Sequence, residues 1–141
     1  MNNFEYYGLF LTEESKAKLK KWLWNNGYGF DNDTIKGVGK WYLDHVTLLH
    51  ITQVQDRPEL ETRLECIMWS NIEAITFEIN GIGESHNALA FRCNIMPYYC
   101  ANKVPHITIC TFNYGKPVDS NYITEWKDIE PIVVEAKLKK R

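Results

Sequence analysis

The sequence predicts an α+β fold that is built on antiparallel strands, and three observations support this class. Two segments, one beginning after Thr12 and one over about residues 57–69, have the apolar spacing of amphipathic helices. The segments around them alternate apolar and polar residues, as half-buried strands do. Two of these strand segments also carry the same short motif, His-x-Thr followed by an aliphatic residue.

Composition limits the class of protein. A chain of 141 residues has the size of one domain, here residues 1–141. The net charge of −2 argues against a broad surface that coats nucleic acid, whereas a nucleotide or an RNA end needs only a local positive site. The N-terminus has no basic region followed by an apolar run, and no apolar stretch reaches membrane-spanning length. We therefore expect a cytoplasmic protein with no membrane partner.

The first third of the chain predicts a strand, a helix and a loop. Phe4 to Leu11 is apolar and aromatic, which indicates a strand. Thr12 is a suitable N-cap, the acidic residues of the following helix come before its lysines, and residues 25–27 supply a helix end. Residues 28–40 are rich in turn formers and predict a long loop.

The middle of the chain predicts a helix and a pair of strands. Asp56 and Glu59 resemble a capping box at the start of the helix over about residues 57–69. Residues 72–80 and 89–95 alternate as two antiparallel strands, and we expect Gly81-Ile82-Gly83 to interrupt the run between them. The helix and the strands also predict buried, reduced thiols at Cys66, Cys93 and Cys110.

The last third predicts a loop over residues 96–103, a second motif strand, and a short helical or irregular stretch around residues 120–127. Residues 132–136 then indicate a final strand. The basic residues 137–141 are most simply a frayed terminus, and attraction of RNA is the alternative interpretation.

The two motifs carry the chemistry. On a strand, residues i and i+2 share a face, so His45 projects with Thr47 and His106 with Thr108, while the intervening aliphatic residues point toward the core. Histidine has both protonation states available near neutral pH, so a pair of imidazoles can act as acid and base on a phosphodiester. The threonine hydroxyls can donate to the phosphate oxygens. Which histidine is the acid is left open.

A third copy, His50-Ile51-Thr52, lies at the end of the first motif strand. In a regular strand His50 points to the face opposite His45, which favours a structural or supporting role. A metal site is the rival use of the histidines. It is disfavoured because zinc catalysis needs three protein ligands, and neither H-E-x-x-H nor C-x-x-C occurs. We expect no metal and no cofactor.

The motif pair resembles the signature of the two-histidine (2H) phosphoesterase superfamily. Asp44-His45-Val46-Thr47-Leu48 and Pro105-His106-Ile107-Thr108-Ile109, with Tyr7-Gly8-Leu9-Phe10-Leu11 upstream, look most like the cyclic phosphodiesterase domain of fungal-type tRNA ligases. The resemblance implies two pseudo-symmetric lobes of antiparallel sheet that flank a cleft, with helices packed on the outside.

The resemblance also implies substrate contacts from aromatic residues and one basic residue around the cleft. Those expected are Tyr7 (or its neighbour Tyr6), Tyr42 (or Trp41), Tyr99 (or Tyr98) and Lys103. The implied activity is metal-independent hydrolysis of a 2′,3′-cyclic phosphate or of a small cyclic or 2′-5′-linked oligonucleotide. Stand-alone viral relatives destroy nucleotide second messengers and so evade immunity, which is one role open to this chain. The alternative is a module that binds a nucleotide or an RNA end without catalysis.

Overall fold

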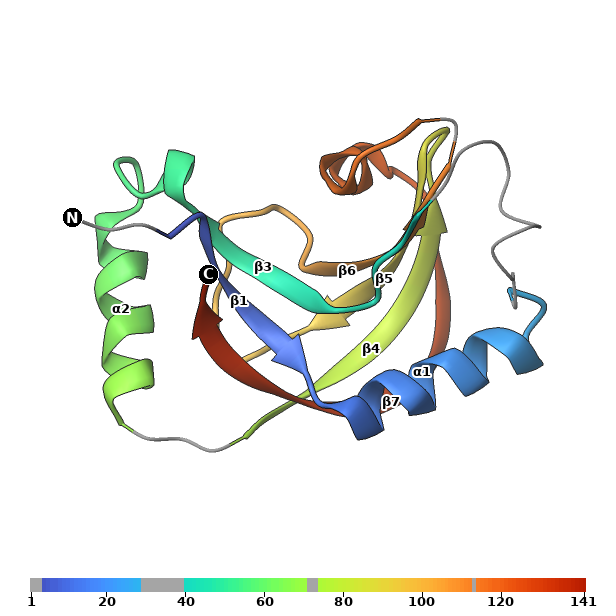
Figure 1. Ribbon diagram of the computed structural model, residues 1–141, viewed down its shortest axis with the longest axis horizontal. Coiled ribbons are helices and arrows are strands. Elements are labelled where there is room, and N and C mark those ends of the chain that lie inside the picture. Colours follow the sequence, from blue (N-terminus) through green and yellow to red (C-terminus); the bar gives the residue numbers. More distant parts are fainter. Residues whose placement is uncertain (1–3, 29–39, 71–73, 113) are drawn as a thin grey trace.

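The strands of this protein form one antiparallel sheet. The computed structural model describes residues 4–28, 40–70, 74–112 and 114–141. Within these residues the seven-stranded sheet has the order β2-β6-β3-β1-β7-β4-β5, and a further pairing of β5 with β6 closes it (Figure 1). The strands are β1 (Tyr6–Leu11), β2 (Lys40–Trp41), β3 (His45–His50), β4 (Ile75–Glu84), β5 (Ala88–Asn94), β6 (His106–Thr111) and β7 (Trp126–Lys140). The helices are α1 (Glu13–Asn25) and α2 (Pro58–Trp69), with the short 3-10 helices η1 (Ile51–Gln53) and η2 (Pro117–Tyr122).

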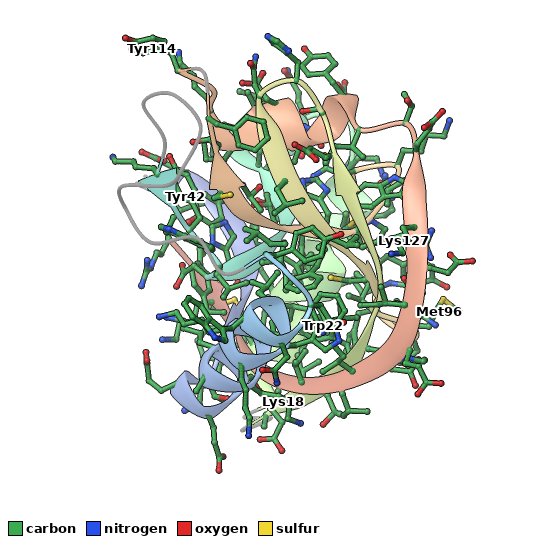
Figure 2. All side chains as sticks on the ribbon, turned by 90° about the vertical axis from the view of Figure 1, so that its right-hand side faces the viewer. Lys18, Trp22, Tyr42, Met96, Tyr114 and Lys127 are labelled. Carbon is green, nitrogen blue, oxygen red and sulfur yellow. The ribbon has the colours of Figure 1, made fainter. Side chains whose placement is uncertain are left out.

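The helix α1 follows its sequence signals. The Thr12 side chain accepts a hydrogen bond from the Ser15 N–H, as an N-cap does. Leu19 and Leu23 are buried, and Gly27 has a φ of 84°, which glycine adopts without strain after a helix. Figure 2 shows Trp22 among the side chains that fill the space between α1 and the strands. The loop that we predict over residues 28–40 lies mostly outside the described residues.

The predicted second helix is confirmed as α2, but its predicted capping box is wrong. The N-cap is Arg57, and no side chain caps the helix. Pro58 occupies the first helical turn, where its missing N–H costs nothing. The helix therefore begins at Pro58, and Asp56 lies one residue too early to be its N-cap. Leu60 and Leu64 are buried as the spacing predicts. Cys66 lies off this stripe and is exposed, so the prediction of a buried thiol is wrong there; Cys93 and Cys110 are buried.

The strand β4 continues through the glycines that we expect to interrupt it. A β-bulge between Ile79 and Gly81 absorbs the irregularity, and the pairing with β5 and β7 then resumes. A Cβ atom at Gly81 would lie 2.8 Å from the guanidinium of Arg92, and one at Gly83 would lie 2.6 Å from the Ile123 side chain. The glycines therefore leave space for the side chains of Arg92 and Ile123 to lie against the backbone of β4, and the strand continues through them.

The strand β7 is longer than predicted, and the interpretation of its basic end as a frayed terminus is wrong. Residues 137–140 pair with β1, with Leu138 opposite Leu9 and Lys139 opposite Gly8. The alternation of the preceding strand continues through Ala136 and Leu138, which pack on the core side, while Lys137 and Lys139 occupy the alternate positions. The end of the chain is thus part of the sheet.

Both helices pack on one face of the sheet, and the hydrophobic core lies between that face and the helices. Trp22 of α1 contacts Phe91 of β5, with the ring centroids 5.7 Å apart, and Tyr7 of β1 donates a hydrogen bond to Glu65 of α2. The predicted antiparallel α+β fold is confirmed, whereas its division into two pseudo-symmetric lobes stays a prediction because the strands pair as one sheet. None of the described helices is long and apolar enough to cross a membrane.

Candidate active site

A cavity of about 670 Å³ opens on the face of the sheet opposite the helices. This volume is in the range of ligand-binding sites. The four motif residues His45, Thr47, His106 and Thr108 all line it. The remaining lining residues are Glu5, which precedes β1, and His50 of β3, with others from β1, the segment before β3, η1, the loop before β6, and η2. The helix η2 is the orange-red coil at the top of Figure 1.

The two motifs meet because β3 and β6 are antiparallel neighbours. Val46 pairs with Ile107, and both side chains are fully buried. An antiparallel register centred on this pair sets His45 beside Thr108 and Thr47 beside His106, on the opposite face. The alternation that the sequence predicts thus brings the two imidazoles and two hydroxyls together around one cavity.

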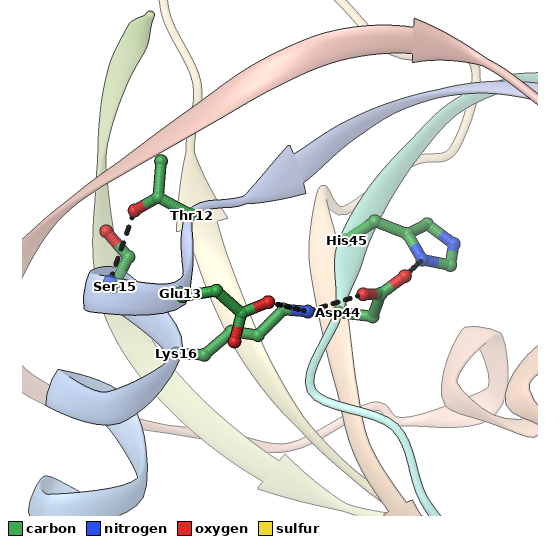
Figure 3. Close-up of polar contacts among 6 residues, drawn as sticks. All are labelled: Thr12, Glu13, Ser15, Lys16, Asp44 and His45. Carbon is green, nitrogen blue, oxygen red and sulfur yellow. Dashed lines mark hydrogen bonds and ion pairs between the residues drawn. The ribbon is translucent and has the colours of Figure 1, made fainter.

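His45 is held by a carboxylate. Its Nδ1 lies 3.2 Å from Asp44 Oδ2, and Asp44 Oδ1 lies 3.0 Å from Lys16 Nζ, which also contacts Glu13 (Figure 3). A carboxylate only accepts hydrogen bonds, so Nδ1 carries the hydrogen and Nε2 is the nitrogen left for proton exchange. Burial would raise the pKa of Asp44, but the hydrogen bonds from Lys16 and His45 hold it below its usual value, so Asp44 is charged.

Two aromatic rings of β1 pack against His45. The centroids of Tyr6 and Phe10 lie 4.8 and 4.9 Å from that of the imidazole, and the rings are nearly parallel to it. Burial lowers the pKa of His45, the Asp44 carboxylate opposes this, and the charges of Arg141 and His106 lower it further. The ring is therefore fixed in place and has a neutral form that is readily available.

His106 has a different partner. Its Nδ1 lies 2.8 Å from the carbonyl oxygen of Val104, which only accepts, so Nδ1 again carries the hydrogen. Burial lowers the pKa of His106, and the hydrogen bond to Val104 opposes that shift. The two histidines thus share a tautomer but differ in charge environment, since only His45 has a carboxylate beside it.

The two threonine hydroxyls are also positioned. Thr47 Oγ1 lies 3.1 Å from His45 Nε2. Thr108 Oγ1 lies 2.8 Å from the hydroxyl of Ser120, a buried residue of η2, and 3.4 Å from the carbonyl oxygen of Pro117. Because a carbonyl oxygen only accepts, Thr108 is the donor to Pro117, and a ligand that accepts from Thr108 must displace this long contact.

The predicted orientation of His50 is wrong. The pairing of β1 with β3 shifts between Tyr7, opposite Leu49, and Gly8, opposite Thr47, so Leu48 is an extra residue. Leu48 and Leu49 are both buried, and this bulge returns His50 to the face that carries His45. His50 therefore lines the cavity as a third imidazole.

Among the residues expected to contact substrate, Tyr42 and Tyr6, the alternative to Tyr7, line the cavity. Tyr7 is fully buried and its hydroxyl donates to Glu65, because Tyr7 alternates with Leu9 on the core side of β1. The neighbouring Tyr6 has the opposite orientation and does line the cavity.

The other two expected contacts also lie away from the cavity lining. Tyr99 is exposed, and the guanidinium of Arg63 on α2 lies 5.1 Å from its ring centroid. Lys103 is exposed on the loop before β6, and its neighbour Asn102 lines the cavity instead. Chain alternation is irregular in this loop, so the sequence does not distinguish the two positions.

Sequence reasoning missed three supporting residues. Asp44 directly precedes the first motif histidine, and an acidic neighbour is a signal that was available. Lys16 and Ser120 reach the site from α1 and η2, and nothing local in the sequence connects them with β3 or β6. No group of three or more histidine, cysteine, aspartate or glutamate side chains in the described residues is arranged to hold a metal ion.

Comparison with known proteins gives one finding about this chain. A family model described as the fungal tRNA ligase phosphodiesterase domain matches residues 42–137. The match spans well over half of the chain and includes both His-x-Thr motifs. A search of curated proteins found no match.

Proposed function

Since this chain belongs to the fungal tRNA ligase phosphodiesterase domain family, a family of 2H phosphoesterases, we propose that it hydrolyses a 2′,3′-cyclic phosphate on a nucleotide or RNA end. The proposed catalysts are His45 and His106, acting without a metal. The observation that carries the proposal is that both imidazoles line one cavity with Nδ1 hydrogen-bonded to an acceptor, so that proton exchange falls to each Nε2, that of His45 lying 3.1 Å from the Thr47 hydroxyl.

The environments of the two histidines favour different roles. Burial lowers the pKa of both histidines, but only at His45 does a carboxylate, that of Asp44, oppose this shift and stabilise the protonated form, which suits a general acid. His106 has only a carbonyl partner and a pKa lowered by burial, which suits a general base. In the proposed step, His106 Nε2 takes a proton from water while the water oxygen attacks phosphorus. His45 Nε2–H protonates the ribose oxygen as its bond to phosphorus breaks, and the product is a nucleoside monophosphate.

The hydroxyls of Thr47 and Thr108 are the proposed donors to the non-bridging phosphate oxygens. Each lies beside a motif histidine, and hydrogen bonds aimed at developing charge are among the largest contributions to catalysis. The lining residues from the described part of the chain include no lysine or arginine. The proposal therefore relies on these hydroxyls and on the protonated imidazole for binding the phosphate.

The same two-histidine chemistry would also cleave the other substrates that the sequence suggests. A small cyclic or 2′-5′-linked oligonucleotide is also a phosphodiester, and its destruction would remove a nucleotide second messenger. The competing function is a module that binds a nucleotide without cleaving it. A binder has no use for two imidazoles whose tautomers are both fixed by acceptors at Nδ1, and this observation favours the enzyme.

The test is product analysis on a panel of substrates with excess chelator. The panel holds 2′,3′-cyclic mononucleotides, an RNA with a 2′,3′-cyclic phosphate end, 2′-5′-linked oligoadenylate and a cyclic dinucleotide. We expect hydrolysis of the 2′,3′-cyclic phosphates, its loss in His45→Ala and His106→Ala, and its retention in His86→Ala, which alters a histidine in the turn between β4 and β5. Turnover that needs a metal, or that survives either motif substitution, would contradict the mechanism. Binding without turnover would favour the binding module.

A further inference from the structure

The end of the cavity beyond Thr47 is lined by side chains for which the proposed chemistry has no use. These are Glu5, His50, Thr52, Gln53 and Asn102, which together form the polar end of the cavity. Strands rise about 3.3 Å per residue, so His50 lies within roughly 10 Å of Thr47 along β3. This separation is comparable to the length of a nucleoside, so a ligand whose phosphate lies at the motifs can reach the polar end.

His50 presents a hydrogen-bond donor. Its Nδ1 accepts from the backbone N–H of Thr52 at 3.2 Å and lies 2.9 Å from the Thr52 hydroxyl. An N–H group only donates, so Nδ1 has no hydrogen in the neutral ring and Nε2 carries it. This tautomer is the opposite of that in His45 and His106, which suits His50 to binding and not to taking a proton at Nε2.

The side-chain amides of Gln53 and Asn102 already make some of their hydrogen bonds within the protein. Gln53 Oε1 accepts from the backbone N–H of His50 at 2.9 Å, and Gln53 Nε2 lies 3.5 Å from Asn102 Oδ1. Within the described residues the side-chain nitrogen of Asn102 therefore remains for a ligand. Its position is set by the contact with Gln53 and by the loop that leads into β6.

Glu5 determines which charge the polar end accepts. The backbone carbonyl oxygen of Glu5 accepts a hydrogen bond from the N–H of Ile51 at 2.7 Å, so Glu5 lies next to η1. Its carboxylate has no ion pair with any described residue, and no lysine or arginine is among the described residues that line the cavity. A second phosphate would meet an unneutralised carboxylate here. A neutral group that donates hydrogen bonds to Glu5 and accepts them from His50 and Asn102 fits instead.

We propose that the polar end is a nucleobase subsite that selects bases with an exocyclic amino group over uracil. Carboxylates accept hydrogen bonds from the N4 amino group of cytosine, and amide side chains pair with base edges. The carbonyl at the same position of uracil would instead face the Glu5 oxygens. The inference rests on the proposed function, because it assumes that the phosphate lies at the two motifs.

The test uses two substrates that differ mainly at this position, cytidine and uridine 2′,3′-cyclic phosphate. We expect kcat/KM to favour cytidine by about tenfold or more, mainly through KM. In Glu5→Gln the preference should fall below about threefold, because an amide offers both a donor and an acceptor. In His50→Ala, KM should rise about tenfold for both substrates with kcat within about threefold, and His50→Gln should restore part of the loss. Glu14→Gln, on the exposed face of α1, is the matched control and should change nothing.

Equal kcat/KM for the two nucleotides, or a cytidine preference that survives Glu5→Gln, would overturn the subsite. Hydrolysis of neither nucleotide would refute the proposed function, and the subsite is then tested by binding. Calorimetry with the variant carrying both His45→Ala and His106→Ala measures the two affinities directly. Tighter binding of the cytidine nucleotide by about tenfold would support the subsite, and equal affinities would overturn it.

Discussion

The carboxylate of Asp44 gives the sharpest test of how the two histidines divide their work. At about 4 Å between charges, an ion pair contributes about 1 kcal/mol in water and about 4 kcal/mol near a protein surface. The side chains of Asp44 and His45 are 30% and 23% exposed, and Lys16 shares the carboxylate, so the lower part of this range applies. One pKa unit corresponds to about 1.4 kcal/mol, and we expect a shift of about that size.

The sign follows from the assigned roles. Asp44 favours the protonated form of His45, so Asp44→Asn should lower the pKa of His45. A general acid must be protonated, so the alkaline limb of the profile of kcat/KM against pH should move down by about one unit. The acidic limb, assigned to His106, should stay in place. We also expect kcat to fall about tenfold, because about 1.4 kcal/mol of stabilisation is lost.

The assay is hydrolysis of a 2′,3′-cyclic nucleotide between about pH 5 and 9, with Asp56→Asn, an exposed aspartate elsewhere, as the matched control. Thermal melting of each variant separates a folding defect from a catalytic one. A shift of the acidic limb in Asp44→Asn would reverse the roles of the histidines. If neither limb moves, Asp44 does not act on His45 at all.

Three further substitutions test the supporting contacts. Lys16→Met removes the positive charge beside Asp44, so the alkaline limb should move up by roughly half a unit, opposite to Asp44→Asn, and a downward shift in the same assay would contradict this. Ser120→Ala should lower kcat about tenfold with little change in KM, because the Thr108 hydroxyl loses the partner that orients it, and an unchanged kcat would remove Ser120 from the site. Tyr7→Phe should leave KM within twofold while denaturant unfolding shows a loss of about 1 kcal/mol, since a core hydrogen bond is deleted, and a large rise in KM would return Tyr7 to substrate binding.

The sequence was sufficient where the structure is periodic. The alternation around His45 and His106 correctly predicts that each shares a face with a threonine and that Val46 and Ile107 are buried. The cap at Thr12 is predicted for the same reason, since the contacts that form it lie within one turn of the chain. Such local patterns require no knowledge of which strands become neighbours.

The errors occur where a single residue breaks the period. The bulge at Leu48 reverses the face of His50, because a shift of one residue moves every later side chain to the other face. Tyr7 and Tyr6 were alternative expectations for a substrate contact, and the regular alternation of β1 places Tyr6 on the cavity side and Tyr7 on the core side. No residue in this stretch signals the bulge, since Leu48 and Leu49 are both ordinary strand residues.

Contacts between distant segments were beyond local patterns. Lys16 meets Asp44 only because α1 packs beside the start of β3, and Ser120 meets Thr108 only because η2 folds over β6. The basic end of β7 resembles a solvated tail in sequence, and its pairing with β1 is what makes it a strand. These features depend on the sheet order, which the sequence does not specify.

The direct test of the two-histidine proposal is the rate of 2′,3′-cyclic phosphate hydrolysis in His45→Ala, His106→Ala and the double variant, with chelator present. General acid and general base catalysis each contribute about 10²- to 10⁴-fold, and residues that act as a unit lose little more when both are removed. We therefore predict that each single variant loses at least about 10²-fold in kcat and that the double variant is within about tenfold of the slower one. A single variant that keeps more than about a tenth of the wild-type kcat would contradict catalysis by this pair.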